Sequence, residues 1–110
     1  MSKHPLNDPM IEQVSKVFGA LSDGSRLKIL RALLEARKPL SQGTVAELTE
    51  LSQANASKHL GYLLRAGLVT RDPQGNTVYF SPVEPLTSEL CDLVCGHVSE
   101  RIRSAYQILK

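Results

Sequence analysis

The sequence predicts a mainly α-helical domain with one small β-hairpin, an α+β arrangement. Over most of the 110 residues, apolar side chains recur every three or four positions, which is the period of an amphipathic helix. The period changes at residues 68–81, where β-branched and aromatic residues flank the turn sequence Pro-Gln-Gly-Asn. A stretch of helical period without internal proline follows over residues 86–109. The predicted order is therefore four helices, a hairpin and a last helix.

The chain begins with a segment that disfavours regular structure. Pro5 and Pro9 disfavour a helix over residues 1–9, which we expect to form a disordered arm. The remaining residues, 10–110, are long enough for one domain with one hydrophobic core. The first helix of this domain is predicted over residues 10–20, where apolar residues recur at helical spacing.

The next three helices are predicted from their capping signals. Ser22 or Asp23 can cap a second helix over residues 25–36. A Thr-x-x-Glu capping box predicts a short third helix over residues 45–51. A serine cap and a terminal glycine bound a fourth helix over residues 53–66. The strands of the hairpin then follow.

The last predicted helix carries two apolar stripes. One stripe can pack on its own domain and the other on a second copy of the chain, which predicts a homodimer. The residues that we expect in this dimer interface are Ile11, Val14, Leu90, Val94, Val98 and Ile102.

The third and fourth helices have the pattern of a helix-turn-helix, in which the second helix enters the major groove of double-stranded DNA by its N-terminal end. Here that end is polar. Its amide side chains can bond to base edges, its serine can reach a base or a phosphate, and its lysine and histidine can contact phosphates. Its small alanines allow close approach. The predicted DNA contacts on this helix are Gln53, Asn55, Ala56, Ser57, Lys58 and His59.

A hairpin directly after such a unit is the wing of a winged helix-turn-helix. The arginine and the turn can reach the neighbouring DNA backbone or minor groove, and the glycine supplies the turn geometry. The predicted wing contacts are Arg71, Gln74, Gly75 and Asn76. Two plainer interpretations stay open: an amphipathic surface helix beside an edge-covering hairpin, or a winged-helix module that binds proteins without binding DNA.

Composition narrows the classes of protein. A net charge of +2 does not by itself identify a nucleic-acid partner, so local charge placement carries that argument. The chain shows no secretory signal and no stretch long enough to span a membrane, so we expect a cytoplasmic protein. It also has no nucleophile–base motif, phosphate loop or metal-hydrolase spacing, and we expect no enzymatic activity.

Three stretches contain further patterns: residues 21–30 are LSDGSRLKIL, residues 51–60 are LSQANASKHL and residues 75–80 are GNTVYF. In this order and at these gaps they resemble motifs of the ArsR/SmtB family of bacterial transcriptional repressors. The chain departs from the family pattern at Gly24, where proline is usual, and at Glu50, where glycine is common.

The resemblance implies a homodimer built from the first and last helices. It also implies binding to an inverted repeat and repression that a small inducer relieves. By the same resemblance, Gln53, Ser57 and His59 face the major groove, while Arg71 and the wing tip hold the flanking DNA.

Many members of that family bind a metal or metalloid ion. The resemblance allows two types of family metal site to be compared with the residues of this chain. One is a Cys-x-Cys at the start of the third helix, and residues 41–43 of this chain contain no thiol there. The other is an Asp-x-His…His-x-x-Glu set on the last helix. His97 and Glu100 supply its second half, but the upstream positions are Glu84 and Leu86, and leucine cannot bind a metal.

Cys91 and Cys95 are the remaining candidates for a sensor. They are four residues apart on one helix, so both thiols point the same way. Thiolates suit thiophilic metals and metalloids, and an exposed pair of low pKa would suit a redox signal without any metal. The alternative is that both cysteines only pack as small apolar side chains.

Overall fold

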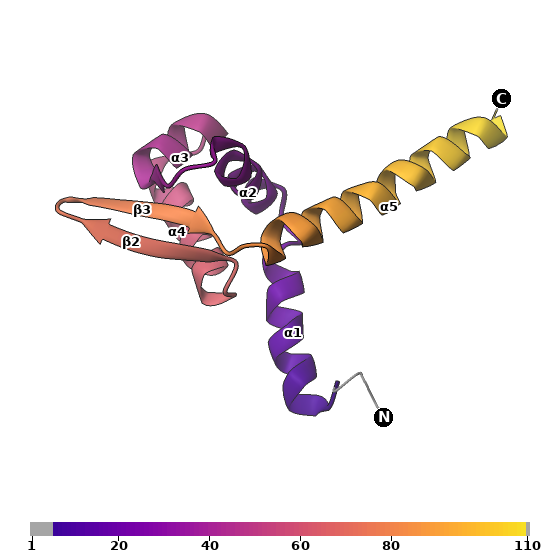
Figure 1. The fold of residues 1–110 in the computed structure, drawn as a ribbon, viewed down its shortest axis with the longest axis horizontal. Helices are drawn as coiled ribbons and strands as arrows, with labels where there is room; N and C mark the ends of the chain where they lie inside the picture. Colours follow the sequence, from indigo (N-terminus) through magenta and orange to yellow (C-terminus); the bar gives the residue numbers. More distant parts are fainter. Residues whose placement is uncertain (1–5, 110) are drawn as a thin grey trace.

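The computed structural model describes residues 6–109, which form five helices and a small antiparallel sheet (Figure 1). The elements along the chain are α1 (Asp8–Ala20), α2 (Gly24–Ala36), β1 (Leu40–Ser41), α3 (Gln42–Thr49), α4 (Gln53–Arg65), β2 (Val69–Gln74), β3 (Thr77–Pro82) and α5 (Leu86–Leu109). This confirms the predicted winged helix-turn-helix order and adds one short strand.

Side-chain caps define the starts of the first four helices. Asp23 Oδ2 accepts from the amide of Arg26 at 3.1 Å, so Asp23, one of the two predicted residues, caps α2. Ser52 Oγ accepts from the amide of Asn55 at 3.1 Å and caps α4 as predicted. Each cap satisfies a backbone donor that has no partner inside its helix.

The predicted starts of α1 and α3 are wrong. Ser41 caps α3 by accepting from the amide of Thr44 at 3.1 Å, so Thr44 lies inside the helix and is not its cap. Pro9 lies in the first turn of α1, where a missing N–H costs nothing. The predicted disordered arm is therefore helical at residues 8 and 9, and its residues 1–5 lie outside the described part of the chain.

One hydrophobic core holds α2, α3, α4 and the sheet together. Its largest fully buried side chains come from α2 and α4, with Leu68 just after α4. The core comprises Ala20, Ile29, Leu30, Leu33, Leu40, Val45, Leu60, Leu63, Leu68, Val69 and Phe80. Burying one such leucine or isoleucine stabilises the fold by roughly 1.5–3 kcal/mol, so this cluster sets how α4 sits on the domain.

The sheet contains a strand that the sequence did not predict. Its order is β1-β3-β2, and β1 pairs antiparallel with β3 through Leu40 opposite Phe80. The predicted hairpin is confirmed, with Val69 opposite Pro82 at its base and Gln74 opposite Thr77 at its tip. Because β1 borders the start of α3, it ties the wing to the helix-turn-helix.

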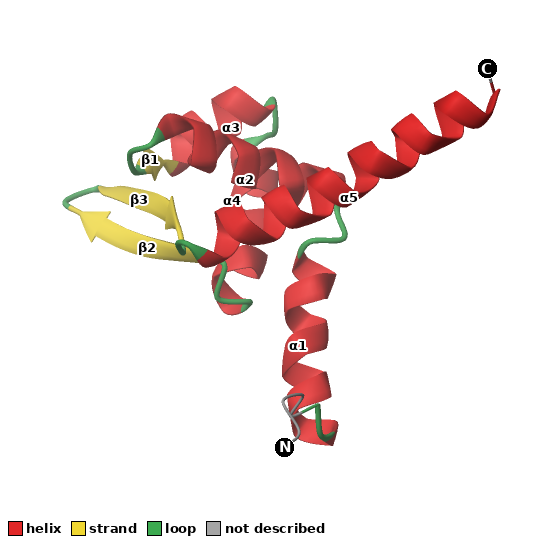
Figure 2. Ribbon diagram, turned by 45° about the vertical axis from the view of Figure 1, so that its right-hand side comes forward, coloured by secondary structure: helices red, strands yellow, loops and turns green. Residues whose placement is uncertain are grey.

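The helices α1 and α5 extend away from the body of the domain (Figures 1 and 2). The first turns of α5 are anchored to the domain: Thr87 is buried and its hydroxyl donates to the carbonyl oxygen of Leu68 at 3.1 Å. Leu90 packs partly against the core, so part of its apolar surface is covered by its own domain. Beyond it, both predicted stripes are exposed, including Leu93, which is 74% exposed.

Among residues 6–109, no helix combines the length and the apolar composition that crossing a bilayer requires.

Candidate nucleic-acid interface

The turn between α3 and α4 sets the direction in which α4 begins. Glu50 ends α3 in the left-handed region, with φ at 60°, and Ser52 then caps α4 in extended conformation. A left-handed residue costs a non-glycine side chain roughly 1–2 kcal/mol, which gives a physical reason for glycine being common at the position of Glu50 in the family pattern. The turn nevertheless forms, with the amide of Leu51 donating to the carbonyl of Ala46 at 3.0 Å.

The first two turns of α4 expose a polar face. Gln53, Asn55, Ser57 and Lys58 are all exposed, and α4 contains no aspartate or glutamate. The helix therefore offers amide, hydroxyl and ammonium groups, and no carboxylate of its own repels a phosphate. The unpaired backbone amides of a helix N-terminus favour an anion at the same place.

Two predicted contacts on α4 are placed differently. Ala56 is fully buried in the core, so the prediction that its side chain approaches DNA is wrong. It lies in helical phase with Leu60 and Leu63, and this phase was readable from the sequence. His59 is largely covered, with a side chain 17% exposed, and it points partly into the protein.

The inward edge of His59 meets two residues at the start of α2. Its Nδ1 lies 3.3 Å from Arg26 Nη1 and 4.0 Å from Asp23 Oδ2. The amide of Arg26, which donates to the Asp23 carboxylate, is the main cause of a lowered pKa for Asp23. This cluster could not be predicted from the sequence, because His59 lies 33 residues after Arg26 and meets it only in the fold.

The wing projects from the domain (Figure 1), with Gln74, Gly75 and Asn76 at its tip and Arg71 within β2, opposite Phe80. Arg71, Gln74, Gly75 and Asn76 are exposed, and Gly75 has a φ of 62°, which confirms the turn role of the glycine. Gln74 donates from Nε2 to Asp72 Oδ2 at 2.9 Å. Asp72 is a carboxylate beside the wing tip that the prediction of DNA contacts did not consider.

Cys91 and Cys95 line one hollow between α5 and α2, which confirms that both thiols face the same way. The hollow has a volume of about 410 Å³, and its other lining residues are Leu27, Lys28, Arg31, Leu34 and Glu35. Both cysteines are free. Burial, and then the neighbouring Cys95, raises the pKa of the Cys91 thiol, so Cys91 lacks the low pKa of a reactive thiolate.

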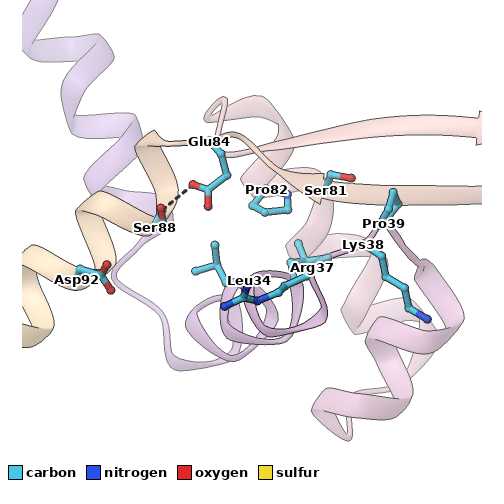
Figure 3. A pocket seen from close by; sticks show the side chains of 10 residues that line it. Leu34, Arg37, Lys38, Pro39, Ser81, Pro82, Glu84, Ser88 and Asp92 are labelled. Carbon is cyan, nitrogen blue, oxygen red and sulfur yellow. Dashed lines mark hydrogen bonds between the residues drawn. The ribbon is translucent and has the colours of Figure 1, made fainter.

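No group of three or more histidine, cysteine, aspartate or glutamate side chains suited to hold a metal ion occurs within residues 6–109. A larger hollow of about 690 Å³ lies between the end of α2, the end of β3 and the start of α5 (Figure 3). It mixes the cations Arg37 and Lys38 with the carboxylates of Glu84 and Asp92, and Glu84 accepts from the amide of Ser88 at 2.8 Å. This mixture of charges selects no ligand class.

The start of α4 is polar and exposed, it follows a short turn after α3, and the β2–β3 hairpin joins the same domain through the sheet. This arrangement defines a winged helix-turn-helix domain of the DNA-binding type. Comparison with known proteins agrees. A family model described as a helix-turn-helix domain matches residues 21–72. The HTH-type transcriptional regulator YceK of Bacillus subtilis is 40% identical over 67 residues, which are 61% of this chain and 67% of that protein.

Two further similarities narrow the family. A cadmium resistance transcriptional regulatory protein, the CadC homolog of Staphylococcus aureus, is 36% identical over 87 residues, covering 79% of this chain and 71% of that protein. The solution structure of the homodimeric winged helix-turn-helix domain of Mb0332 from Mycobacterium bovis, described as a possible ArsR-family regulator, superposes with a TM-score of 0.79 at 27% identity, covering 94% and 95% of the two chains. The chain belongs to the ArsR/SmtB family and is a DNA-binding transcriptional regulator.

Proposed function

We propose that the protein is a homodimeric repressor that binds an inverted-repeat operator with one α4 helix in each of two major grooves. The observation that carries the proposal is the exposed, carboxylate-free start of α4, which is held rigidly by the core behind it. In this arrangement Gln53 and Asn55 read base edges, Ser57 bonds to a base or a phosphate, and Lys58 neutralises a phosphate.

The wing supplies a second, less sequence-dependent contact. Arg71 binds the flanking backbone, and the tip at Gln74, Gly75 and Asn76 approaches the minor groove. The carboxylate of Asp72 limits the charge gain of the wing, and its bond from Gln74 keeps it engaged within the protein. We therefore assign sequence recognition to α4 and general affinity to the wing.

A second copy of the chain is the proposed partner of the uncovered helices. α1 exposes Ile11 and Phe18, and α5 exposes Val94, Val98 and Ile102, so about half or more of each of these side chains faces solvent. Exposed apolar side chains along both helices mark an association site. Covering it with the same two helices of a second chain gives a symmetric interface and presents two copies of α4.

The proposed signal acts on α5. The two thiols of Cys91 and Cys95 border the α2–α5 hollow, where a thiophilic ion or an oxidant would alter how α5 leaves the domain. The spacing of the two α4 helices would change with it, and both half-sites could no longer be bound together. In this proposal the protein acts in the cytoplasm and catalyses no reaction.

The test is binding to duplex DNA together with oligomeric state. Ser57→Ala combined with His59→Ala weakens operator binding and leaves the dimer intact, whereas the control Ser15→Ala on α1 changes neither. Ile102→Glu yields monomers in sedimentation and loses operator affinity. A wild-type chain that is monomeric, or that binds operator and random DNA equally, contradicts the proposal.

A second experiment addresses the signal. Operator binding is measured with and without thiophilic metals, arsenite, oxidants and reactive sulfur species. It compares the wild type with Cys91→Ser/Cys95→Ser. Release of the wild type alone supports a thiol sensor, and equal behaviour of the two proteins assigns the cysteines to packing.

A further inference from the structure

Arg26, in the first turn of α2, contacts two helices to which the proposed function gives different roles. These are α1, which forms part of the dimer interface, and α4, which contacts the DNA bases. Its Nε donates to the carbonyl oxygen of Ala20 at 2.8 Å, and its Nη2 donates to that of Gly19 at 3.2 Å. Both acceptors lie in the last turn of α1. The same guanidinium faces α4 with its remaining edge.

These two bonds add donors to the end of α1, where the carbonyl oxygen of Gly19 also accepts from the amide of Ser22 at 3.2 Å and from its hydroxyl at 2.7 Å. The last carbonyls of a helix have no intrahelical partner and carry partial negative charge, which a cation stabilises. The last turn of α1 contains no basic residue of its own. Arg26 thus provides from α2 the positive charge and two further donors, in the planar fork geometry that lysine cannot reproduce.

The side of the guanidinium that faces α4 makes two more contacts. Arg26 Nη1 lies 3.3 Å from Nδ1 of His59. Because a guanidinium only donates, a hydrogen bond between the two groups requires Nδ1 to accept, which the tautomer with its proton on Nε2 allows. The guanidinium carbon also lies 4.0 Å from the ring centroid of Tyr62, at cation–π distance. His59 and Tyr62 are one turn apart on α4, beside its reading face.

The packing of α1 explains why these contacts have consequences. Val17, Ala20 and Leu21 at its end join the core, while the rest of α1 extends outward (Figure 2). A small rotation at this junction is therefore a large displacement at the far end of α1. One side chain that bonds both the end of α1 and the body of α4 limits that rotation.

We propose that Arg26 is a positioning residue for operator recognition, holding α4 at a fixed angle to α1 so that the dimer presents its two reading helices at the spacing of the operator. The inference rests on the proposed function for the roles of α1 and α4. His59 then acts chiefly through Arg26, and not as a phosphate contact.

The test compares Arg26→Met with Arg31→Met, an exposed arginine of the same helix. Affinity for operator and for random duplex DNA is measured across a salt series. We expect Arg26→Met to lower the operator-to-random affinity ratio at least tenfold with an unchanged salt slope, since no phosphate contact is lost. Arg31→Met leaves the ratio unchanged. An unaltered ratio for Arg26→Met overturns the inference, as does a slope that falls by about one per lost contact.

His59 variants keep the inference testable if Arg26→Met does not fold. His59→Leu removes the acceptor and lowers the ratio, whereas His59→Gln, which can still accept from the guanidinium, restores most of it. Equal losses in both variants overturn the inference, because a direct or purely space-filling role of histidine would produce them.

A measurement without DNA separates this inference from the proposed function. Spin labels at Ser15→Cys on α1 and Ser57→Cys on α4 are placed in a Cys91→Ser/Cys95→Ser background, diluted with unlabelled protein. The distance distribution between the labels broadens with Arg26→Met and not with Arg31→Met. If the wild type does not prefer operator DNA, the proposed function is wrong. If the distance distribution does not broaden with Arg26→Met, the positioning role of Arg26 is wrong, whatever the result with DNA.

Discussion

Replacing Lys58 with glutamine tests whether the start of α4 lies against DNA. Lys58 is exposed in the second turn of α4, on a helix without carboxylates. Glutamine has a helix propensity close to that of lysine and an unbranched polar side chain, but it carries no charge. The fold and the dimer should therefore be unchanged, and any effect on DNA affinity reports electrostatics.

The expected magnitude follows from the charge count. A homodimer presents two copies of Lys58, and each neutralised phosphate contributes about 0.9 to the slope of log affinity against log salt. Losing both contacts lowers the slope by about 1.8. Between about 50 and about 200 mM salt, the affinity of the wild type should then fall about twelvefold more than that of Lys58→Gln.

The assay is fluorescence anisotropy of a labelled operator at four or more salt concentrations. Lys28→Gln, which removes the same charge from α2, is the matched control and should keep the wild-type slope. If Lys58→Gln and Lys28→Gln have the same slope as the wild type, Lys58 contacts no phosphate and our placement of α4 in the groove is refuted.

Three further predictions follow from other contacts. Arg71→Ala in the wing weakens binding to operator and random DNA alike and flattens the salt slope, so a loss confined to the operator would contradict its backbone role. Thr87→Val lowers the free energy of unfolding by about 1 kcal/mol in urea denaturation at fixed protein concentration, because the carbonyl of Leu68 keeps only its bond from the amide of Val83. The control Thr70→Val, at an exposed site, changes the free energy of unfolding by less than about 0.5 kcal/mol. Equal effects of the two substitutions would contradict the role of Thr87 as the anchor of α5. Iodoacetamide at pH 8 alkylates Cys95 faster than Cys91, since the raised pKa of Cys91 leaves less thiolate at that pH, and mass spectrometry showing the reverse order would contradict this.

The sequence predicted the helices and the wing because their signals are local. Ser52 and Gly67 bound α4 within one segment, and the turn at Gly75 lies between two short runs of β-formers. Such features depend on neighbouring residues and need no knowledge of the fold. The ends of elements were predicted less accurately, as Pro9 shows, because a proline that breaks a helix interior is acceptable in the first turn of a helix.

What the sequence did not predict depends on contacts between distant segments. The two-residue strand β1 exists only because Leu40 and Ser41 pair with Phe80 and Tyr79 of β3, which lie far along the chain. The bonds of Arg26 likewise join α1, α2 and α4 after folding. Ala56 is a different case, because its helical phase with the buried leucines of α4 already indicated that it is buried. The DNA contact predicted for it rested on the polar residues next to it in the sequence, and was wrong.

The exposed apolar side chains of α1 and α5 are the surface on which the predicted dimer would form. A terminal helix with two apolar stripes needs two partners, and the first turns of α5, around Thr87 and Leu90, pack on their own domain. The apolar pattern predicted that a partner exists. It did not show that Leu90 also packs against its own core, because both stripes have the same period.

The most direct measurement is selection of binding sites from random duplex DNA, by the wild type and by Gln53→Ala/Ser57→Ala. The account predicts that the wild type enriches an inverted repeat whose half-sites lie about one DNA turn apart, and that the variant loses base preference within the half-sites while still dimerising. Enrichment of a single half-site by the wild type, or the same base preferences in both proteins, would contradict recognition by paired α4 helices.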